Sequence, residues 1–162
     1  MTKILDGKFV SGEILDNVNL YINETMSNDI SLKNPAMAVV MVGDNPASET
    51  YVKFKMRACK KAGIEARLFK YSDDIDSSDF INEVKKLNKS HFDGFIVQLP
   101  LPDHINQQYV INSIDPDMDI DGFTPTNFGR MALGLDKEKD FYMKPATPYG
   151  ILKLLQYYDI ET

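Results

Sequence analysis

Residues 36–46 have the sequence AMAVVMVGDNP, an unbroken apolar run that stops at a turn. A continuous apolar run of this length fits a strand that is buried on both faces, as strands are in a parallel sheet. Gly43, Asp44, Asn45 and Pro46 are typical of a turn after such a strand. The stretch therefore predicts an internal strand over residues 36–42, and the rest of the fold extends outward from it.

Two further strands are expected on the C-terminal side, over residues 64–71 and 94–99. A helix should follow the first strand, from about Ser48, interpreted as its N-cap, to Gly63 at its C-terminal end. Strands that alternate with helices of this length indicate βαβ units. The predicted fold class is therefore α/β, with a mainly parallel sheet and helices on both faces, a three-layer sandwich.

Apolar residues at helical spacing indicate three more amphipathic helices. Their apolar residues are, in chain order, Val10, Ile14, Leu15, Val18, Tyr21 and Ile22; then Phe80, Val84 and Leu87; then Ile151, Leu154, Leu155 and Tyr158. Ser77 or Ser78 is expected to cap the middle helix, and Thr147, followed by Pro148, the last one. Residues 136–140 are predicted to form an exposed loop.

Composition limits the classes of protein that this chain fits. It has 162 residues, 43% of them apolar and 26% charged, and a net charge of −6, values that fit one soluble globular domain. Its basic residues form no stripe, so nucleic acid is not an expected partner. No apolar run approaches the length of a membrane span, and the N-terminus lacks the apolar segment of a signal peptide. Cys59 is the only cysteine, which fits a reducing, cytoplasmic setting.

The helix after the first strand carries several basic residues that helical geometry separates. At about 100° per residue, Lys55 falls among the apolar positions, one turn from Tyr51, while the other basic residues lie on the opposite side. Lys55 either lays its stem on the core edge, or sits in a pocket where desolvation and nearby cations lower its pKa and make it a general base or acid. Tyr51 is either a half-buried aromatic residue or a stacking surface for a flat ligand. The residues alone leave both alternatives open.

Gln98 is expected at the carboxyl end of the third strand, where open α/β sheets bind their ligands. A single glutamine is ordinarily a surface residue. Strand ends and the starts of the following helices share one sheet edge, however, so Tyr51, Lys55 and Gln98 can converge there.

The acidic residues Asp117, Asp119 and Asp121, followed by Gly122, match the opening of a calcium-binding EF-hand loop. The match fails at the twelfth position, where the loop needs glutamate and this chain has Phe128. These aspartates otherwise form a solvated edge, or one of them is a buried acceptor for a heterocycle with adjacent N–H donors. The two histidines lack metal-ligand spacing, so no metal site is expected, and no Gly-x-Gly-x-x-Gly or P-loop sequence occurs.

Four ordered motifs resemble the bifunctional methylene-tetrahydrofolate dehydrogenase/methenyl-tetrahydrofolate cyclohydrolase family, and the resemblance covers nearly the whole chain. The motifs are ILDGK at residues 4–8, GDNPASETYVKFK at 43–55, GFIVQLPLP at 94–102 and DIDGF at 119–123.

The resemblance implies a cytoplasmic, NADP-dependent enzyme of one-carbon metabolism, connected to purine biosynthesis, that acts on tetrahydrofolate derivatives and needs no metal. It implies that Lys55 is the essential cyclohydrolase group and that Tyr51 and Gln98 assist it. Asp121 would bind the pterin ring. Further folate contacts would come from Val97, Leu99 and Pro100.

Three departures from the family pattern stand out. Met118 replaces a lysine, and Ala146 replaces a cysteine next to Thr147, the one expected contact to the nicotinamide cofactor. The chain also ends at Thr162, before the family's nucleotide-binding domain. The expected organisation is therefore a folate-binding catalytic domain over residues 1–146 and, over residues 147–162, a helix that leads toward the nucleotide-binding domain. The family implies a homodimeric parent, with a monomer expected for this chain; the alternative function is folate binding without dehydrogenase turnover.

Overall fold

The sheet is built around the apolar run of residues 36–42. In the structure, a computed structural model that describes residues 4–135 and 142–161, β1 (Ala36–Val42) lies between β2 (Glu65–Tyr71) and β3 (Gly94–Val97). Both pairings are parallel, and Val39 is the register partner of Leu68 on one side and Ile96 on the other. The predicted parallel α/β fold is confirmed. Residues 136–140, predicted as a loop, lie outside the described residues.

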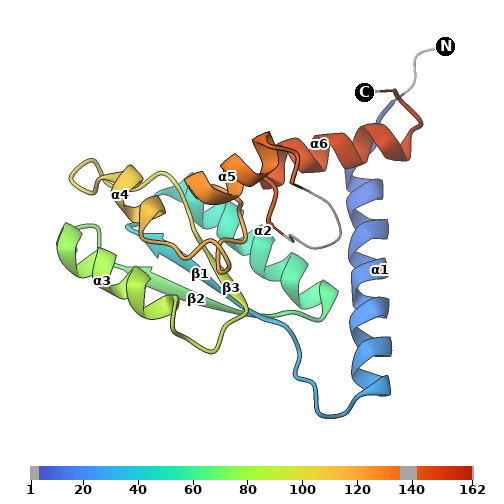
Figure 1. Cartoon of the computed structure of the whole chain (residues 1–162), viewed down its shortest axis with the longest axis horizontal. Coiled ribbons are helices and arrows are strands. Elements are labelled where there is room, and N and C mark those ends of the chain that lie inside the picture. Colours follow the sequence, from blue (N-terminus) through green and yellow to red (C-terminus); the bar gives the residue numbers. More distant parts are fainter. Residues whose placement is uncertain (1–3, 136–141, 162) are drawn as a thin grey trace.

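Helices cover both faces of this sheet, which gives the three predicted layers. The helix α2 (Pro46–Ala62) lies on one face, and α3 (Ser77–Leu87) lies on the other (Figure 1). A short helix, α4 (Gln107–Asn112), contacts α3. The chain continues through α5 (Pro125–Ala132) to α6 (Ala146–Tyr157), which contacts the N-terminal helix α1 (Gly7–Asn28). Among the described residues, no helix has both the length and the hydropathy needed to cross a bilayer.

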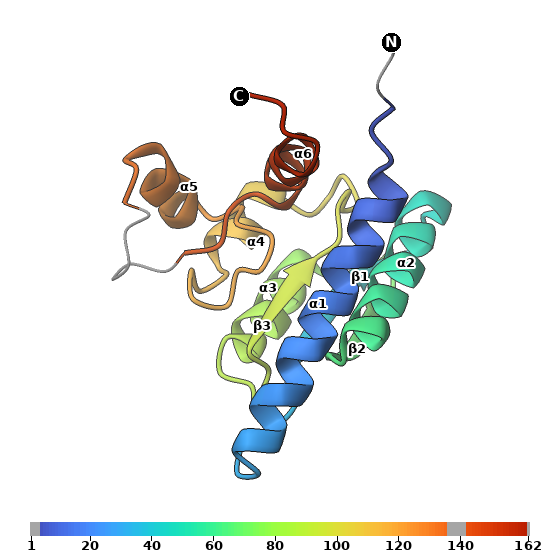
Figure 2. The same cartoon turned by 90° about the vertical axis from the view of Figure 1, so that its right-hand side faces the viewer.

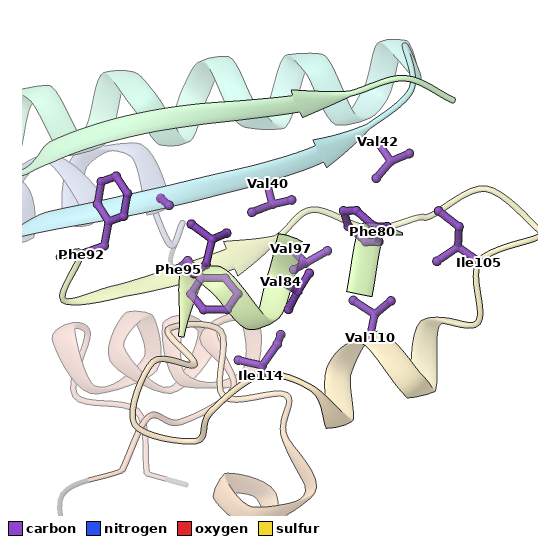
Figure 3. Packing of buried hydrophobic residues seen from close by; sticks show 12 residues of the cluster. Val40, Val42, Phe80, Val84, Phe92, Phe95, Val97, Ile105, Val110 and Ile114 are labelled. Carbon is purple, nitrogen blue, oxygen red and sulfur yellow. The ribbon is translucent and has the colours of Figure 1, made fainter. Parts of the chain in front are cut away.

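The alternation of side chains along β1 divides the core into two clusters. Val40 packs toward α3 and α4 with Phe80, Val84 and Phe95, all of them almost fully buried (Figure 3). Val39 belongs to the second cluster, which includes residues of α2. Because successive strand residues point to opposite faces, an apolar run with no polar interruption is what a doubly covered strand requires.

The third strand is shorter than predicted. The strand β3 ends at Val97, although the backbone N–H of Gln98 still donates to the carbonyl of Val40 at 2.8 Å. Pro100 and Pro102 follow, and proline has no N–H to continue a ladder. Gln98 therefore stands at the carboxyl end of the strand, as expected.

Two helix starts differ from the prediction. The N-cap of α2 is Asn45, not Ser48, because the side chain of Asn45 accepts from the amides of Ala47 and Ser48. Pro46 then occupies the first helical position, which needs no N–H partner. The N-cap of α3 is Asp76, whose side chain accepts from the amides of Ser78 and Asp79, and not Ser77 or Ser78. In both cases a side chain farther upstream reaches the free amides of the first turn.

The terminal helices are less buried than their apolar patterns predict. In α1, Val10 and Ile22 are buried, whereas Ile14 and Tyr21 are exposed. This helix lies beside α2 (Figure 2), which covers only part of its surface. The helix α6 has no buried residue, and Ile151 of its predicted apolar stripe is 55% exposed.

The start of α6 also differs from the prediction. The prediction that Thr147 caps this helix is wrong, because the helix already begins at Ala146 and Pro145 is its N-cap.

Candidate active site

Three segments that are distant in the sequence meet at the carboxyl edge of the sheet: the first three turns of α2, the residues after β3, and residues 119–122. Lys55 comes from the third turn of α2, and its Nζ lies 3.8 Å from Oδ2 of Asp121. The fold thus brings together a helix residue and a loop residue that sequence analysis had only placed in separate motifs. The carboxyl edge is where parallel α/β sheets bind ligands.

The environment of Lys55 combines features of both predicted alternatives. Its side chain is 34% exposed, so it is half-buried beside the apolar face of α2 that Val52, Cys59 and Ala62 form. The other basic residues of the helix are exposed, as the wheel geometry predicts. The stem of Lys55 thus lies on the edge of the core and its amine faces the carboxylate of Asp121. In this position the amine can exchange a proton with a ligand bound beside Asp121. That its amine is neutral stays a prediction.

Asp121 is the more buried partner, with a side-chain exposure of 17%. Burial raises the pKa of Asp121 above its usual range, and the negative charge of Asp119 adds to this, whereas Lys55 opposes it. Removal of a carboxylate from water disfavours its charged form. Asp121 is therefore an acceptor that a ligand with N–H donors can stabilise further.

The two polar atoms of the Gln98 side-chain amide differ in their hydrogen bonding. Its Nε2 donates to the carbonyl oxygen of Leu99 at 2.8 Å. Its Oε1 is buried and finds no hydrogen-bond partner among the described residues. A buried acceptor without a hydrogen-bond partner destabilises the folded chain by about 1–3 kcal/mol. A ligand that brings a donor to this oxygen removes that penalty, which favours its binding. This atom suits an ammonium group or the N–H of a bound heterocycle.

The remaining residues predicted to contact the substrate differ in how far they are exposed to solvent. Tyr51 is 63% exposed, so its ring face is open to a ligand. Leu99 is half-buried and Pro100 is exposed. Val97 is almost fully buried in the α3-side core, yet with Leu99 and Asp121 it lines a small cavity of about 10 Å³.

Thr147 lies apart from the lysine site in the chain, in the first turn of α6, and is exposed. Its neighbour Ala146 lines a cavity of about 900 Å³ between α1 and α6. Met118, the other departure from the family pattern, packs against the main core cluster. Both substitutions therefore occupy positions that accept an apolar side chain.

The aspartates of the calcium alternative are directed at different partners. Asp119 accepts hydrogen bonds from backbone amides and from Asn127, and Asp121 faces Lys55. Asp117 is exposed, with its side chain 86% accessible. No group of three or more metal-ligating side chains occurs within residues 4–135 and 142–161.

The sequence did not predict the burial of three polar residues near the site. Ser48 donates to the carbonyl of Leu99 at 3.4 Å and so connects α2 to the segment after β3. Thr124 and Asn127 are almost fully buried beside Asp119. The sequence Thr124-Pro125 is a helix-start signal that could have located the start of α5, but nothing in it predicts the burial of Asn127.

The fold and the site define an α/β domain in which a lysine and a buried carboxylate meet at the carboxyl edge of a parallel sheet. Residues 5–121 match the family described as tetrahydrofolate dehydrogenase/cyclohydrolase, catalytic domain. This chain belongs to that family.

Individual relatives agree with this assignment. The bifunctional protein FolD 1 of Geobacter metallireducens is 45% identical over 159 residues, which cover 98% of this chain and 52% of that protein. The crystal structure of the bifunctional methylenetetrahydrofolate dehydrogenase/cyclohydrolase FolD from Campylobacter jejuni superposes with a TM-score of 0.89 at 37% identity, over 98% of this chain and 54% of that one.

A more distant structure shares the fold. The Trypanosoma brucei methylenetetrahydrofolate dehydrogenase-cyclohydrolase, solved with NADP cofactor and an inhibitor, has a TM-score of 0.89 at 24% identity, over 99% of this chain and 53% of that one. The chain thus spans about half the length of the relatives it matches.

Proposed function

We propose that residues 1–146 form the folate-binding catalytic domain of a methylenetetrahydrofolate dehydrogenase/methenyltetrahydrofolate cyclohydrolase. The observation that carries this proposal is the 3.8 Å approach of Lys55 to Asp121 in a chain that belongs to the tetrahydrofolate dehydrogenase/cyclohydrolase family. The buried, unpaired Oε1 of Gln98 at the end of β3 supports it. Residues 147–162 would then lead toward a nucleotide-binding domain. The substrate class is tetrahydrofolate derivatives.

The polar groups have complementary roles in binding the substrate. Asp121 accepts from the adjacent N–H donors of the pterin ring, because a partly buried carboxylate gains most from charge-assisted hydrogen bonds. Tyr51 stacks on the flat ligand with its exposed ring. Leu99 and Pro100, with the edge of Val97, form the apolar border of the site.

Lys55 moves protons in the hydrolytic step. Water adds to the carbon of the methenyl cation, a C–O bond forms, and the neutral amine of Lys55 takes the proton that the water loses. One C–N bond of the ring then breaks, its nitrogen is protonated, and formyltetrahydrofolate remains. The net change is addition of one water and release of one proton. Gln98 orients the amine through its Oε1. In the ligand-free chain Lys55 pairs with Asp121. A charged Lys55 would repel the cationic substrate, so the mechanism requires its neutral form once that substrate is bound.

The oxidative step transfers a hydride from methylenetetrahydrofolate to a nicotinamide, and we propose NADP as that cofactor in the longer protein. The described residues hold no Gly-x-Gly-x-x-Gly turn, and Thr147 is the one contact to the cofactor that we propose for this chain. In the oxidative step, the residues of this chain therefore bind the folate substrate. A homodimeric parent, a monomeric 162-residue chain and a cytoplasmic location belong to the same proposal.

A second function is folate binding without turnover. It is favoured by the openness of the site on the side of Tyr51, which is 63% exposed and so leaves one face of a bound pterin uncovered. Water-exposed sites weaken the electrostatic interactions on which proton transfer and charge stabilisation depend.

The test compares Lys55→Met with Lys53→Met in the 162-residue chain. Lys53 lies on the same helix but is 70% exposed and paired with Glu49, so it controls for the loss of one positive charge. Hydrolysis of methenyltetrahydrofolate should fall by roughly 10²- to 10⁴-fold in Lys55→Met, the range of general acid–base catalysis, and stay near wild type in Lys53→Met. The proposal is wrong if Lys55→Met retains its turnover. Folate binding without turnover in the wild-type chain would establish the second function.

A further inference from the structure

The turn that carries Asp121 is anchored by buried polar groups that the proposed mechanism does not use. Asp119 is 2% exposed, and its carboxylate accepts three hydrogen bonds. The donors are the amide of Phe123 at 3.2 Å, the amide of Thr124 at 2.8 Å and the side-chain Nδ2 of Asn127 at 3.0 Å. One carboxylate thus closes the turn over residues 119–124.

Asn127 connects this turn to two other segments. It is fully buried, and its Nδ2 also donates to the carbonyl of Pro116 at 2.8 Å. Its own amide donates to the hydroxyl of Thr124, the N-cap of α5. Asn127 therefore connects the segment before the turn, the turn itself and the start of α5.

The turn is also held against the sheet. The amide of Phe95 donates to the carbonyl of Met118 at 2.8 Å, and Phe95 and Asp119 form a parallel bridge. Gly94 permits this approach, because a Cβ atom there would lie 2.7 Å from Cγ1 of Ile120. Asp121 follows two residues after this anchored point, so small changes in the turn would move its carboxylate relative to Lys55.

We propose that Asp119 and Asn127 are positioning residues for the lysine site: their buried hydrogen-bond network fixes the 119–124 turn so that Asp121 faces Lys55. This inference rests on the proposed folate function, since it assigns to Asp121 a geometry that only ligand binding requires. The charged groups that act on Asp121 are Lys55 from α2 and Asp119 from the turn itself.

The experiment uses Asn127→Ala in the 162-residue chain, which removes the donor but keeps the charge of Asp119. Asn88→Ala is the matched control: its amide also bridges two backbone groups, the carbonyl of Ser113 and the amide of Asp115, but it lies at the end of α3. Two readouts are compared with wild type: hydrolysis of methenyltetrahydrofolate, and the pH titration of the Asp121 carboxyl carbon by ¹³C NMR.

Asn127→Ala should lower turnover by roughly 10- to 100-fold, the cost of a misplaced site group, and should shift the Asp121 titration to lower pH because the carboxylate becomes more hydrated. Asn88→Ala should leave both readouts near wild type. If Asn127→Ala gives no cooperative unfolding transition, Asn127→Ser, which keeps a small polar group, replaces it.

An unchanged Asp121 titration together with unchanged turnover in a folded Asn127 variant would overturn the positioning role while leaving the folate function intact. If the wild-type chain neither binds nor hydrolyses folate, the proposed function fails, and the NMR titration alone decides whether the network positions Asp121.

Discussion

Asp121 shows how burial sets the behaviour of a single residue in this site. Its raised pKa means that the folded chain binds a proton at this carboxyl more readily than the unfolded chain does. Below the pKa that Asp121 has in the unfolded chain, the carboxyl is protonated in both states and its ionisation does not change the free energy of unfolding. As the pH rises through the folded pKa, ionisation of the buried group progressively destabilises the folded state.

Replacement of Asp121 by asparagine should therefore stabilise the chain at neutral pH, on the order of 0.5 kcal/mol, because the charge no longer loses hydration. The gain should disappear toward pH 3, where wild-type Asp121 is protonated. Urea unfolding of both proteins across this pH range measures the difference. A variant that is less stable at pH 7 would show that attraction by Lys55 outweighs desolvation.

At the scale of single elements, the start of α2 matters most because this helix carries Tyr51 and Lys55. Its first-turn amides are satisfied by Asn45, while Ser48 is buried inside the first turn. A side chain that caps a helix fixes where its first turn begins, and hence the rotation of every later residue about the helix axis.

Asn45→Ala should lower the free energy of unfolding by about 1 kcal/mol, a usual cost for the loss of an N-cap. Ser48→Ala should cost less, since the hydrogen bond that its hydroxyl donates within the described residues, to the carbonyl of Leu99, is long at 3.4 Å. Chemical denaturation of the two variants decides between the caps. A larger loss of stability for Ser48→Ala than for Asn45→Ala would favour Ser48, the residue predicted from the sequence, as the cap.

At the scale of the whole molecule, stability depends on the core between the sheet and α3. Phe80 is fully buried there and contacts Tyr71 edge to face, with ring centroids 5.6 Å apart. The α1 and α6 surfaces, by contrast, expose apolar residues such as Ile14 and Ile151. We therefore expect substitutions in the packed core on the α3 side of the sheet to lower the free energy of unfolding most.

Phe80→Ala should destabilise the chain by about 3–5 kcal/mol, the usual cost of the cavity left by a buried phenylalanine. Phe54→Ala is the matched control, because Phe54 is 61% exposed and its removal should change stability by no more than about 0.5 kcal/mol. Thermal and urea unfolding of both variants provide the measurement. Similar losses for the two would mean that the α3-side core does not dominate stability.

Much of the fold was determined by the sequence alone, because the signals involved are local. The apolar run of β1, the alternation of strands and helices, and the position of Lys55 on the inner side of α2 depend on residues within a few turns of one another. The predicted helix caps at Ser48, Ser77 or Ser78 and Thr147 failed for a related reason. The starts of α2 and α3 each hold several capping residues, and backbone geometry chooses among them. At α6 the helix begins after Pro145, which provides no side-chain cap.

Only the tertiary structure decided which polar groups meet. The 3.8 Å approach of Lys55 to Asp121, the burial of Asn127 beneath the turn and the exposure of Ile14 all depend on contacts between segments far apart in the chain. Hydrophobic periodicity specifies which face of an element turns inward, but it carries no information about which other element will cover that face. Long-range packing supplies that choice, and it converts separate motifs into one site.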